Sequence, residues 1–129
     1  MVMKKIFIIA VILITSVPAF AGRVYYQADY FSYDEGKGWS NWQQVGIGVL
    51  YDSNDRNVFI NTKNPQIYHL LSSEGEGYDE DGDYVRAYNF VDEENVHGII
   101  RFVYRTTYQR NEIYIIYSNL KILYVVHKI

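Results

Sequence analysis

The sequence has 129 residues, with 15 acidic and 12 basic side chains, a formal charge of −3 and no cysteine. This length allows one domain with its own core, and no disulfide framework holds it together. A net acidic chain without a basic stripe matches neither nucleic acid nor an anionic membrane surface. The 14 tyrosines favour β-structure.

Residues 1–21 are predicted to be a secretory signal peptide rather than part of the fold. They combine a short basic start, an apolar run over residues 6–14 and a small-residue signature at residues 19–21. The apolar run is too short for a transmembrane helix, which needs about 20 apolar residues. Cleavage after Ala21 removes Lys4 and Lys5 but no acid, so the formal charge changes from −3 to −5.

The signal peptide predicts that the mature chain is secreted or periplasmic, with no transmembrane span. It enters an oxidising space without a cysteine, and it carries no Asn-x-Ser/Thr glycosylation acceptor. These features are typical of a bacterial envelope or secreted protein. We expect residues 22–129 to form a single all-β domain.

The first half of this domain reads as strands separated by polar turns. Residues 23–33 are predicted to be a strand with aromatic side chains on both faces, and residues 34–38 end it. The strand over residues 43–52 alternates cleanly, with its apolar side chains opposite Gly46 and Gly48. Two glycines on one face mark a bend, or a place where something lies close to the backbone.

The following segments repeat this pattern. Strands are predicted over residues 57–62 and 66–71, and the glycine-rich polar run 72–83 is predicted to be a loop. Two further strands are predicted over residues 84–91 and 96–105. In the second of these, one side carries Ile100, Phe102 and Tyr104, and the side assigned to solvent carries His97, Arg101 and Arg105.

Residues 112–128 predict a β-hairpin with Ser118-Asn119 as its two-residue loop. This register places Ile113 opposite Tyr124 and Ile115 opposite Ile122 on one apolar face. A slip by one residue would move both isoleucines to the mixed face, so the pattern itself favours this register.

About eight short strands without helical crossovers predict a single antiparallel meander. Such a chain can close into a small barrel or fold into a two-layer sandwich, and the sequence leaves both open. The C-terminal hairpin is so apolar that an exposed edge there would invite aggregation. We therefore expect it to be central or well covered.

Trp39 and Trp42, flanked by Tyr33 and followed by the two glycines, form the main candidate binding site. Exposed aromatic rings beside a shallow strand offer a platform for a sugar ring or a partner protein. The alternative is structural: both rings plug one end of the barrel, or they cover the glycines across the sheet.

Two groups of residues carry side chains of the kind that bind metals. The acidic run Asp79-Glu80-Asp81-Gly82-Asp83 lacks the EF-hand glycine and glutamate positions, so a solvated loop is favoured over a looser calcium site with Glu74, Glu76 or the turn 92–95. His69, His97 and His127 lie on separate strands without ligand spacing. We expect no metal and no cofactor.

Catalytic motifs are also missing from the sequence, which has no cysteine nucleophile, no G-x-S-x-G elbow, no H-E-x-x-H and no P-loop. The hypothesis is a non-catalytic binding module, not an enzyme, whose partner is an unknown protein or glycan and whose oligomeric state is unknown. The alternatives are a lipocalin-like carrier of a small apolar ligand and a hydrolase with dispersed acidic residues.

Overall fold

The computed structural model describes residues 22–129, so the predicted signal peptide lies outside the described residues. The described part consists of antiparallel strands without a helix. They are β1 (Arg23–Asp34), β2 (Gln43–Asp52), β3 (Asn57–Ile60), β4 (Gln66–Tyr78), β5 (Tyr84–Asp92), β6 (His97–Arg105), β7 (Arg110–Ile116) and β8 (Lys121–Lys128). Among residues 22–129, no helix is long and apolar enough to cross a membrane.

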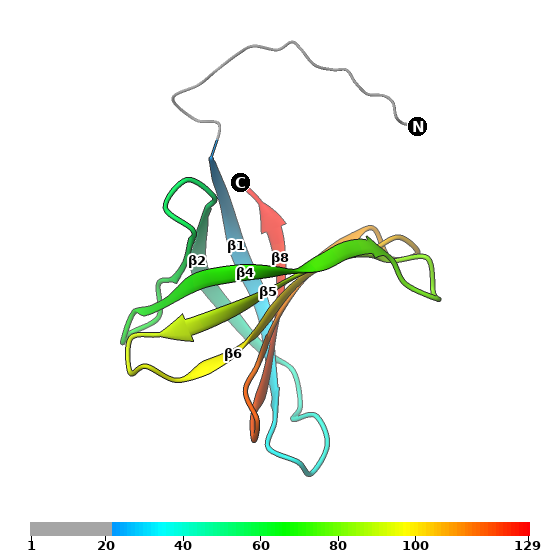
Figure 1. The fold of residues 1–129 in the computed structure, drawn as a ribbon. Helices are drawn as coiled ribbons and strands as arrows, with labels where there is room; N and C mark the ends of the chain where they lie inside the picture. Colours follow the sequence, from blue (N-terminus) through cyan, green and yellow to red (C-terminus); the bar gives the residue numbers. More distant parts are fainter. Residues whose placement is uncertain (1–21) are drawn as a thin grey trace, which may run out of the picture.

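The strands form one closed barrel in sequence order, because β1 pairs with both β2 and β8. This decides between the two predicted architectures in favour of the barrel. The start of β1 and the end of β8 lie side by side, and the β1–β2 loop lies at the other end (Figure 1).

The alternating strand directions place the connections at two ends of the barrel. The tryptophan end carries residues 35–42, 61–65, 93–96 and 117–120. The terminal end carries residues 53–56, 79–83 and 106–109, together with the start of β1 and the end of β8.

The predicted hairpin register is confirmed. Ile113 pairs with Tyr124 and Ile115 with Ile122, and the amide of Tyr117 donates to the carbonyl oxygen of Leu120 across the two-residue loop at 2.8 Å. The hairpin has no free edge, since β7 pairs with β6 and β8 pairs with β1. Barrel closure therefore protects the most apolar stretch of the chain.

The interior is filled with side chains rather than left hollow. Large aromatic and β-branched residues from all eight strands form one buried cluster, in which Phe90 packs edge-on against Tyr68 at 4.9 Å between ring centroids. Val49 and Tyr51 of β2 belong to it, as the alternation in that strand predicted. Such filling is usual for small barrels.

Two sequence predictions about strands are corrected. Residues 72–78 are not a loop, because β4 continues to Tyr78 and pairs with β5. The ladder uses backbone groups, so it tolerates polar side chains, and two register shifts accommodate Gly75 and its neighbours. Arg105 does not simply face solvent but is part-buried beside two carboxylates, whereas Tyr104 is exposed at the barrel end.

Candidate functional site

The β1–β2 loop at the tryptophan end is fixed by hydrogen bonds to β1. The hydroxyl of Ser32 donates to the carbonyl oxygen of Ser40 at 2.8 Å, and the backbone amide of Tyr33 donates to Ser40 Oγ at 3.0 Å. Asp34 Oδ1 accepts the amides of Gly36 and Gly38. The positive φ of both glycines lets the chain turn around this carboxylate.

This fixed loop presents both tryptophans to solvent. Trp39 is 47% exposed and Trp42 is 51% exposed, and neither belongs to the buried cluster. The structural alternative of a barrel plug is therefore wrong. The glycine-cover alternative is also wrong, because a Cβ atom built on Gly46 or Gly48 would meet nothing within 4 Å.

The three predicted site residues do not form one cluster. The Trp39 ring packs edge-on against Tyr114 at 6.3 Å between ring centroids. Tyr114 lies on the outer face of the barrel, because its neighbours in β7, Ile113 and Ile115, face the core. Tyr33 instead lies on the core-facing side of β1, near the Phe31 ring at 5.9 Å and opposite Ile122. Trp39 and Tyr33 thus belong to opposite faces of the barrel wall.

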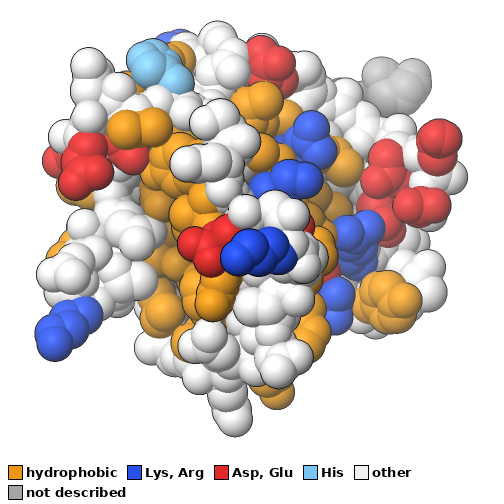
Figure 2. Space-filling model, turned by 90° about the horizontal axis from the view of Figure 1, so that it is seen from below, with side chains coloured by type: hydrophobic (Ala, Val, Ile, Leu, Met, Phe, Trp, Pro, Cys, Tyr) orange, Lys and Arg blue, Asp and Glu red, His pale blue; other side chains and the backbone are white. Residues whose placement is uncertain are grey.

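A cavity of about 380 Å³ opens at the same end, a feature that the sequence did not reveal. Tyr68, Tyr117 and Ile122 line it, together with the acidic turn that begins at Asp92. Figure 2 shows the molecule from below, with hydrophobic side chains in the middle of the view, an acidic and a basic side chain lying over them, and further charged side chains toward the edges. The lining residues come from different strands, so no local pattern marks them.

Polar groups in this cavity are hydrogen-bonded to one another. The Tyr117 hydroxyl donates to Asp92 Oδ2 at 2.8 Å, and the Tyr68 hydroxyl donates to Gln66 Oε1 at 2.8 Å. Burial raises the pKa of both tyrosines, which keeps their hydroxyls protonated. Partial burial alone would raise the pKa of Asp92, but donors that include the Val96 amide and the Tyr117 hydroxyl lower it overall.

The acidic loop at the terminal end brings three carboxylates together. Oxygen atoms of Asp79, Asp81 and Asp83 lie within 4.8 Å of one another, whereas the turn 92–95 is at the opposite end of the barrel. Two of the three carboxylates already accept hydrogen bonds from other groups of the protein. Asp79 Oδ1 accepts the amides of Asp81 and Asp83, and Asp83 binds Arg105 and the amide of Thr106.

The histidines do not converge. His69 lies 2.9 Å from Asn57 Oδ1 and 2.7 Å from Glu93 Oε2, while His127 Nδ1 lies 2.6 Å from Asp29 Oδ2. Within residues 22–129, no group of potential metal ligands includes a histidine.

The buried acids are neutralised by arginines. Asp52 faces Arg23 at 3.3 Å, Asp83 faces Arg105 at 2.9 Å, and Glu112 faces Arg105 at 2.8 Å. Hydrogen bonds from the backbone amides of Asp55 and Asn54 lower the pKa of Asp52. Hydrogen bonding to Arg105 is the largest cause that lowers the pKa of Asp83. A general acid needs the opposite shift, so this arrangement favours a structural role for these carboxylates.

The fold and these sites define a small closed all-β barrel with connecting loops at both ends and aromatic side chains at its surface. Comparison of the chain with protein-family models, with curated proteins and with solved structures found no match.

Proposed function

We propose that this protein is an exported, non-catalytic binding domain that recognises a protein or a glycan through Trp39 and Trp42. The observation that carries the proposal is the exposure of both indole rings on a loop whose backbone is held by hydrogen bonds. Large amphipathic aromatics contribute most to binding when they enter a partner's pocket or stack on a sugar ring. A loop that is already ordered loses little conformational entropy on binding.

The two tryptophans are the only ones in the sequence, so intrinsic fluorescence reports on this surface directly. Residues 22–129 would be titrated with chito-oligosaccharides and cello-oligosaccharides, and applied in parallel to a glycan array and a displayed random-peptide library. Binding should quench or shift the tryptophan emission.

The decisive variant carries Trp39→Ala and Trp42→Ala together. It should lose binding to the array or to the selected peptides, yet keep the circular dichroism and melting temperature of the wild type within a few degrees. The matched control carries Tyr78→Ala and Tyr108→Ala, because these exposed aromatics lie at the terminal end. Equal loss of binding in the control, or unfolding of the tryptophan variant, would contradict the proposal.

Export is tested separately. Expression of all 129 residues in a bacterium should yield a mature product, in the periplasm or the medium, whose N-terminal sequence begins at Gly22. A product that keeps residues 1–21 in the membrane fraction would contradict the signal-peptide assignment.

A small-ligand carrier is the second candidate, and the cavity at the tryptophan end favours it. Its volume of about 380 Å³ falls within the usual range for ligand pockets, and barrel mouths are common ligand sites. The buried cluster contributed by all eight strands counts against the lipocalin-like version, which needs a partly empty interior. Displacement of a bound fluorescent dye by fatty acids or porphyrins would favour the carrier. The hydrolase hypothesis is tested by a broad screen of the purified domain for hydrolytic activity.

A further inference from the structure

Arg86 of β5 occupies the mouth of the barrel at the terminal end. It pairs across the sheet with Phe102, so its side chain starts on the core-facing side. The guanidinium carbon lies 5.4 Å from the centroid of the Phe102 ring and 5.7 Å from that of Tyr51. The two aromatic rings therefore cover the guanidinium with cation–π contacts.

Within residues 22–129, Arg86 forms no ion pair with a carboxylate. Arg23, Arg105 and Arg110 each form an ion pair with a carboxylate, whereas Arg86 forms neither an ion pair nor a side-chain hydrogen bond in the described barrel. Glu76 lies opposite Arg86 in the β4–β5 ladder, but its carboxylate accepts the Tyr84 hydroxyl.

An arginine stacked in this way keeps its hydrogen-bonding edge available. Guanidinium carries five N–H donors in the plane of the group, and cation–π contacts use only its faces. The planar fork of donors fits a carboxylate or a phosphate with two parallel hydrogen bonds. A part-buried arginine without a protein acceptor therefore offers a site for an anion.

Two cavities lie at this end of the barrel, and Arg86 lines the first of them. The first, of about 130 Å³, is lined by Arg86, Lys128, Asn111 and tyrosine rings that include Tyr26. Glu112 also borders it, but arginines bind both of its carboxylate oxygens. This cavity is several times larger than the volume of about 30 Å³ that one water molecule occupies in the liquid.

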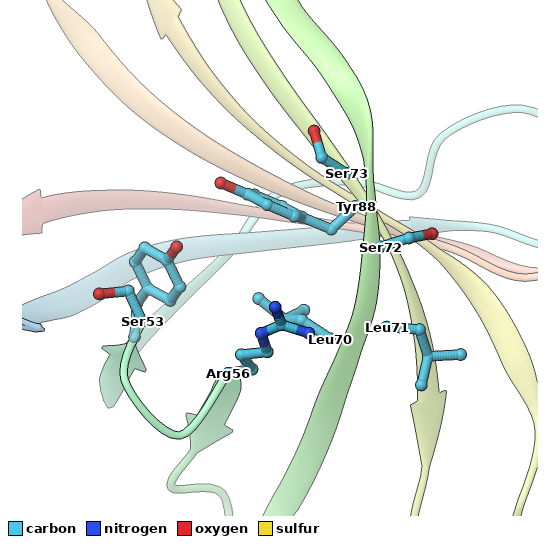
Figure 3. A pocket seen from close by; sticks show the side chains of 8 residues that line it. Ser53, Arg56, Leu70, Leu71, Ser72, Ser73 and Tyr88 are labelled. Carbon is cyan, nitrogen blue, oxygen red and sulfur yellow. The ribbon is translucent and has the colours of Figure 1, made fainter.

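The second cavity, of about 190 Å³, is lined by Tyr51, one of the two rings that contact Arg86. Arg56 is its one charged lining residue, and Ser53 and the Tyr51 and Tyr88 phenols add hydroxyl groups. In Figure 3, Arg56 points toward Leu70 on the side of Ser53 and Tyr88, while Leu71 and Ser72 point away on the other side of β4. Burial, with the Tyr88 hydrogen bond, raises the pKa of Tyr51 to about 12, so this phenol stays protonated.

We propose that the terminal end of the barrel binds the carboxylate or phosphate of a small ring-bearing ligand. Arg86 takes the oxyanion through its free donors, and the aromatic rings of Tyr51, Tyr88 and Phe102 contact the ring of the ligand. Arg56 and Lys128 add positive charge around the mouth. This site lies at the opposite end from the tryptophans and does not depend on the function proposed for them.

The test compares three probes of nearly equal size: benzoate, phenyl phosphate and the neutral benzamide. Titration of residues 22–129, followed by two-dimensional NMR, should show at least about tenfold tighter binding of one or both anions than of benzamide. The shifted amides should cluster on β5, β6 and the turn 53–56. The better of benzoate and phenyl phosphate distinguishes a carboxylate site from a phosphate site.

Arg86→Gln should weaken anion binding by at least about tenfold, and Arg86→Lys should restore part of it, because lysine keeps the charge but loses the fork. Arg101→Gln is the matched control, since it removes one positive charge from an exposed position on the opposite face of β6. Trp39→Ala with Trp42→Ala should leave anion binding intact. Equal affinity of the wild type for benzamide and both anions would overturn the proposal, as would equal weakening by Arg101→Gln.

Discussion

Glu112 shows how one residue on the outer barrel surface becomes buried. It alternates with the core residues of β7, yet it is only 1% exposed, because the arginine side chains and Tyr114 surround it. Its Oε1 accepts Arg105 and Tyr114, and its Oε2 accepts Arg110. A carboxylate this deeply buried is stable only while such donors remain in place.

Replacement of Glu112 by Gln should therefore destabilise the barrel. The variant leaves Arg105 and Arg110 close together without their shared anion, and we expect a loss of about 2 to 3 kcal/mol in the free energy of unfolding. This figure is below that for a fully buried pair, since both arginines are partly exposed. Urea denaturation measures it, with the exposed Glu94→Gln as control. A loss within about 0.5 kcal/mol would contradict this role for Glu112.

Asp83 should account for part of the decrease in the free energy of unfolding at acidic pH. Hydrogen bonds from Arg105 and then from the Thr106 amide hold the pKa of Asp83 below its ordinary value. A carboxylate whose pKa is lower in the folded state stabilises the protein above the unfolded-state pKa of about 3.9, and this stabilisation is lost as the pH falls through the folded pKa.

We therefore expect Asp83→Asn to flatten the fall in stability between about pH 5 and pH 3, besides lowering stability at neutral pH. Urea midpoints measured across this range test the expectation. Asp81→Asn, in the same loop but exposed, is the control and should follow the wild-type curve. Parallel curves for Asp83→Asn and the wild type would show that Asp83 has no such effect.

At the scale of the strand, Gly98 and Gly46 make a matched pair. A Cβ atom on Gly98 would lie 2.5 Å from the Phe90 ring and 2.5 Å from the carbonyl oxygen of Ile116, whereas one on Gly46 would meet nothing within 4 Å. Phe90 is fully buried between the Tyr68 and Tyr117 rings, so it has little freedom to move aside.

Gly98→Ala should consequently cost about 2 kcal/mol, a typical penalty for overpacking a filled core. Gly46→Ala should change the free energy of unfolding by less than about 0.5 kcal/mol, or stabilise slightly by restricting the unfolded chain. Thermal and urea denaturation of the two variants measure this difference. Equal effects of the two substitutions would show that the space around Phe90 is not the constraint.

The elements that sequence reasoning recovered are those with a local apolar pattern. The β7–β8 register followed from alternation, because any slip would expose Ile113 and Ile115. The end of β4 was missed, since residues 72–78 have no apolar face and are held in the ladder by backbone hydrogen bonds to β5. The surroundings of Arg86 were missed for another reason: its partners lie on other strands and meet only when the barrel closes.

At the scale of the whole molecule, the pairing of β1 with β8 is what turns a meander into a barrel. Tyr26 pairs with Lys128, and the amide of Ile129 donates to the carbonyl oxygen of Tyr25 at 3.0 Å. The two ends of the described chain therefore lie next to each other (Figure 1). Once closed, the barrel has continuous pairing around its wall, so a new chain break should be tolerated where it falls in an exposed connection between strands.

A circular permutant tests this directly. The chain would begin at Asn64, continue to Ile129, pass through a linker of about six glycine and serine residues, and resume at Gly22 to end at Lys63. The new break falls in an exposed connection between β3 and β4, so the permutant should fold with the near-ultraviolet circular dichroism of the parent.

The control permutant opens the chain between Asn89 and Phe90, inside β5. It should fail to fold, because the break divides a strand paired on both sides and frees the backbone beside a fully buried ring. If the β3–β4 permutant also fails while the parent folds, the β1–β8 junction is not a continuous part of the wall. If both permutants fold, an unbroken β5 is not needed for the barrel to form.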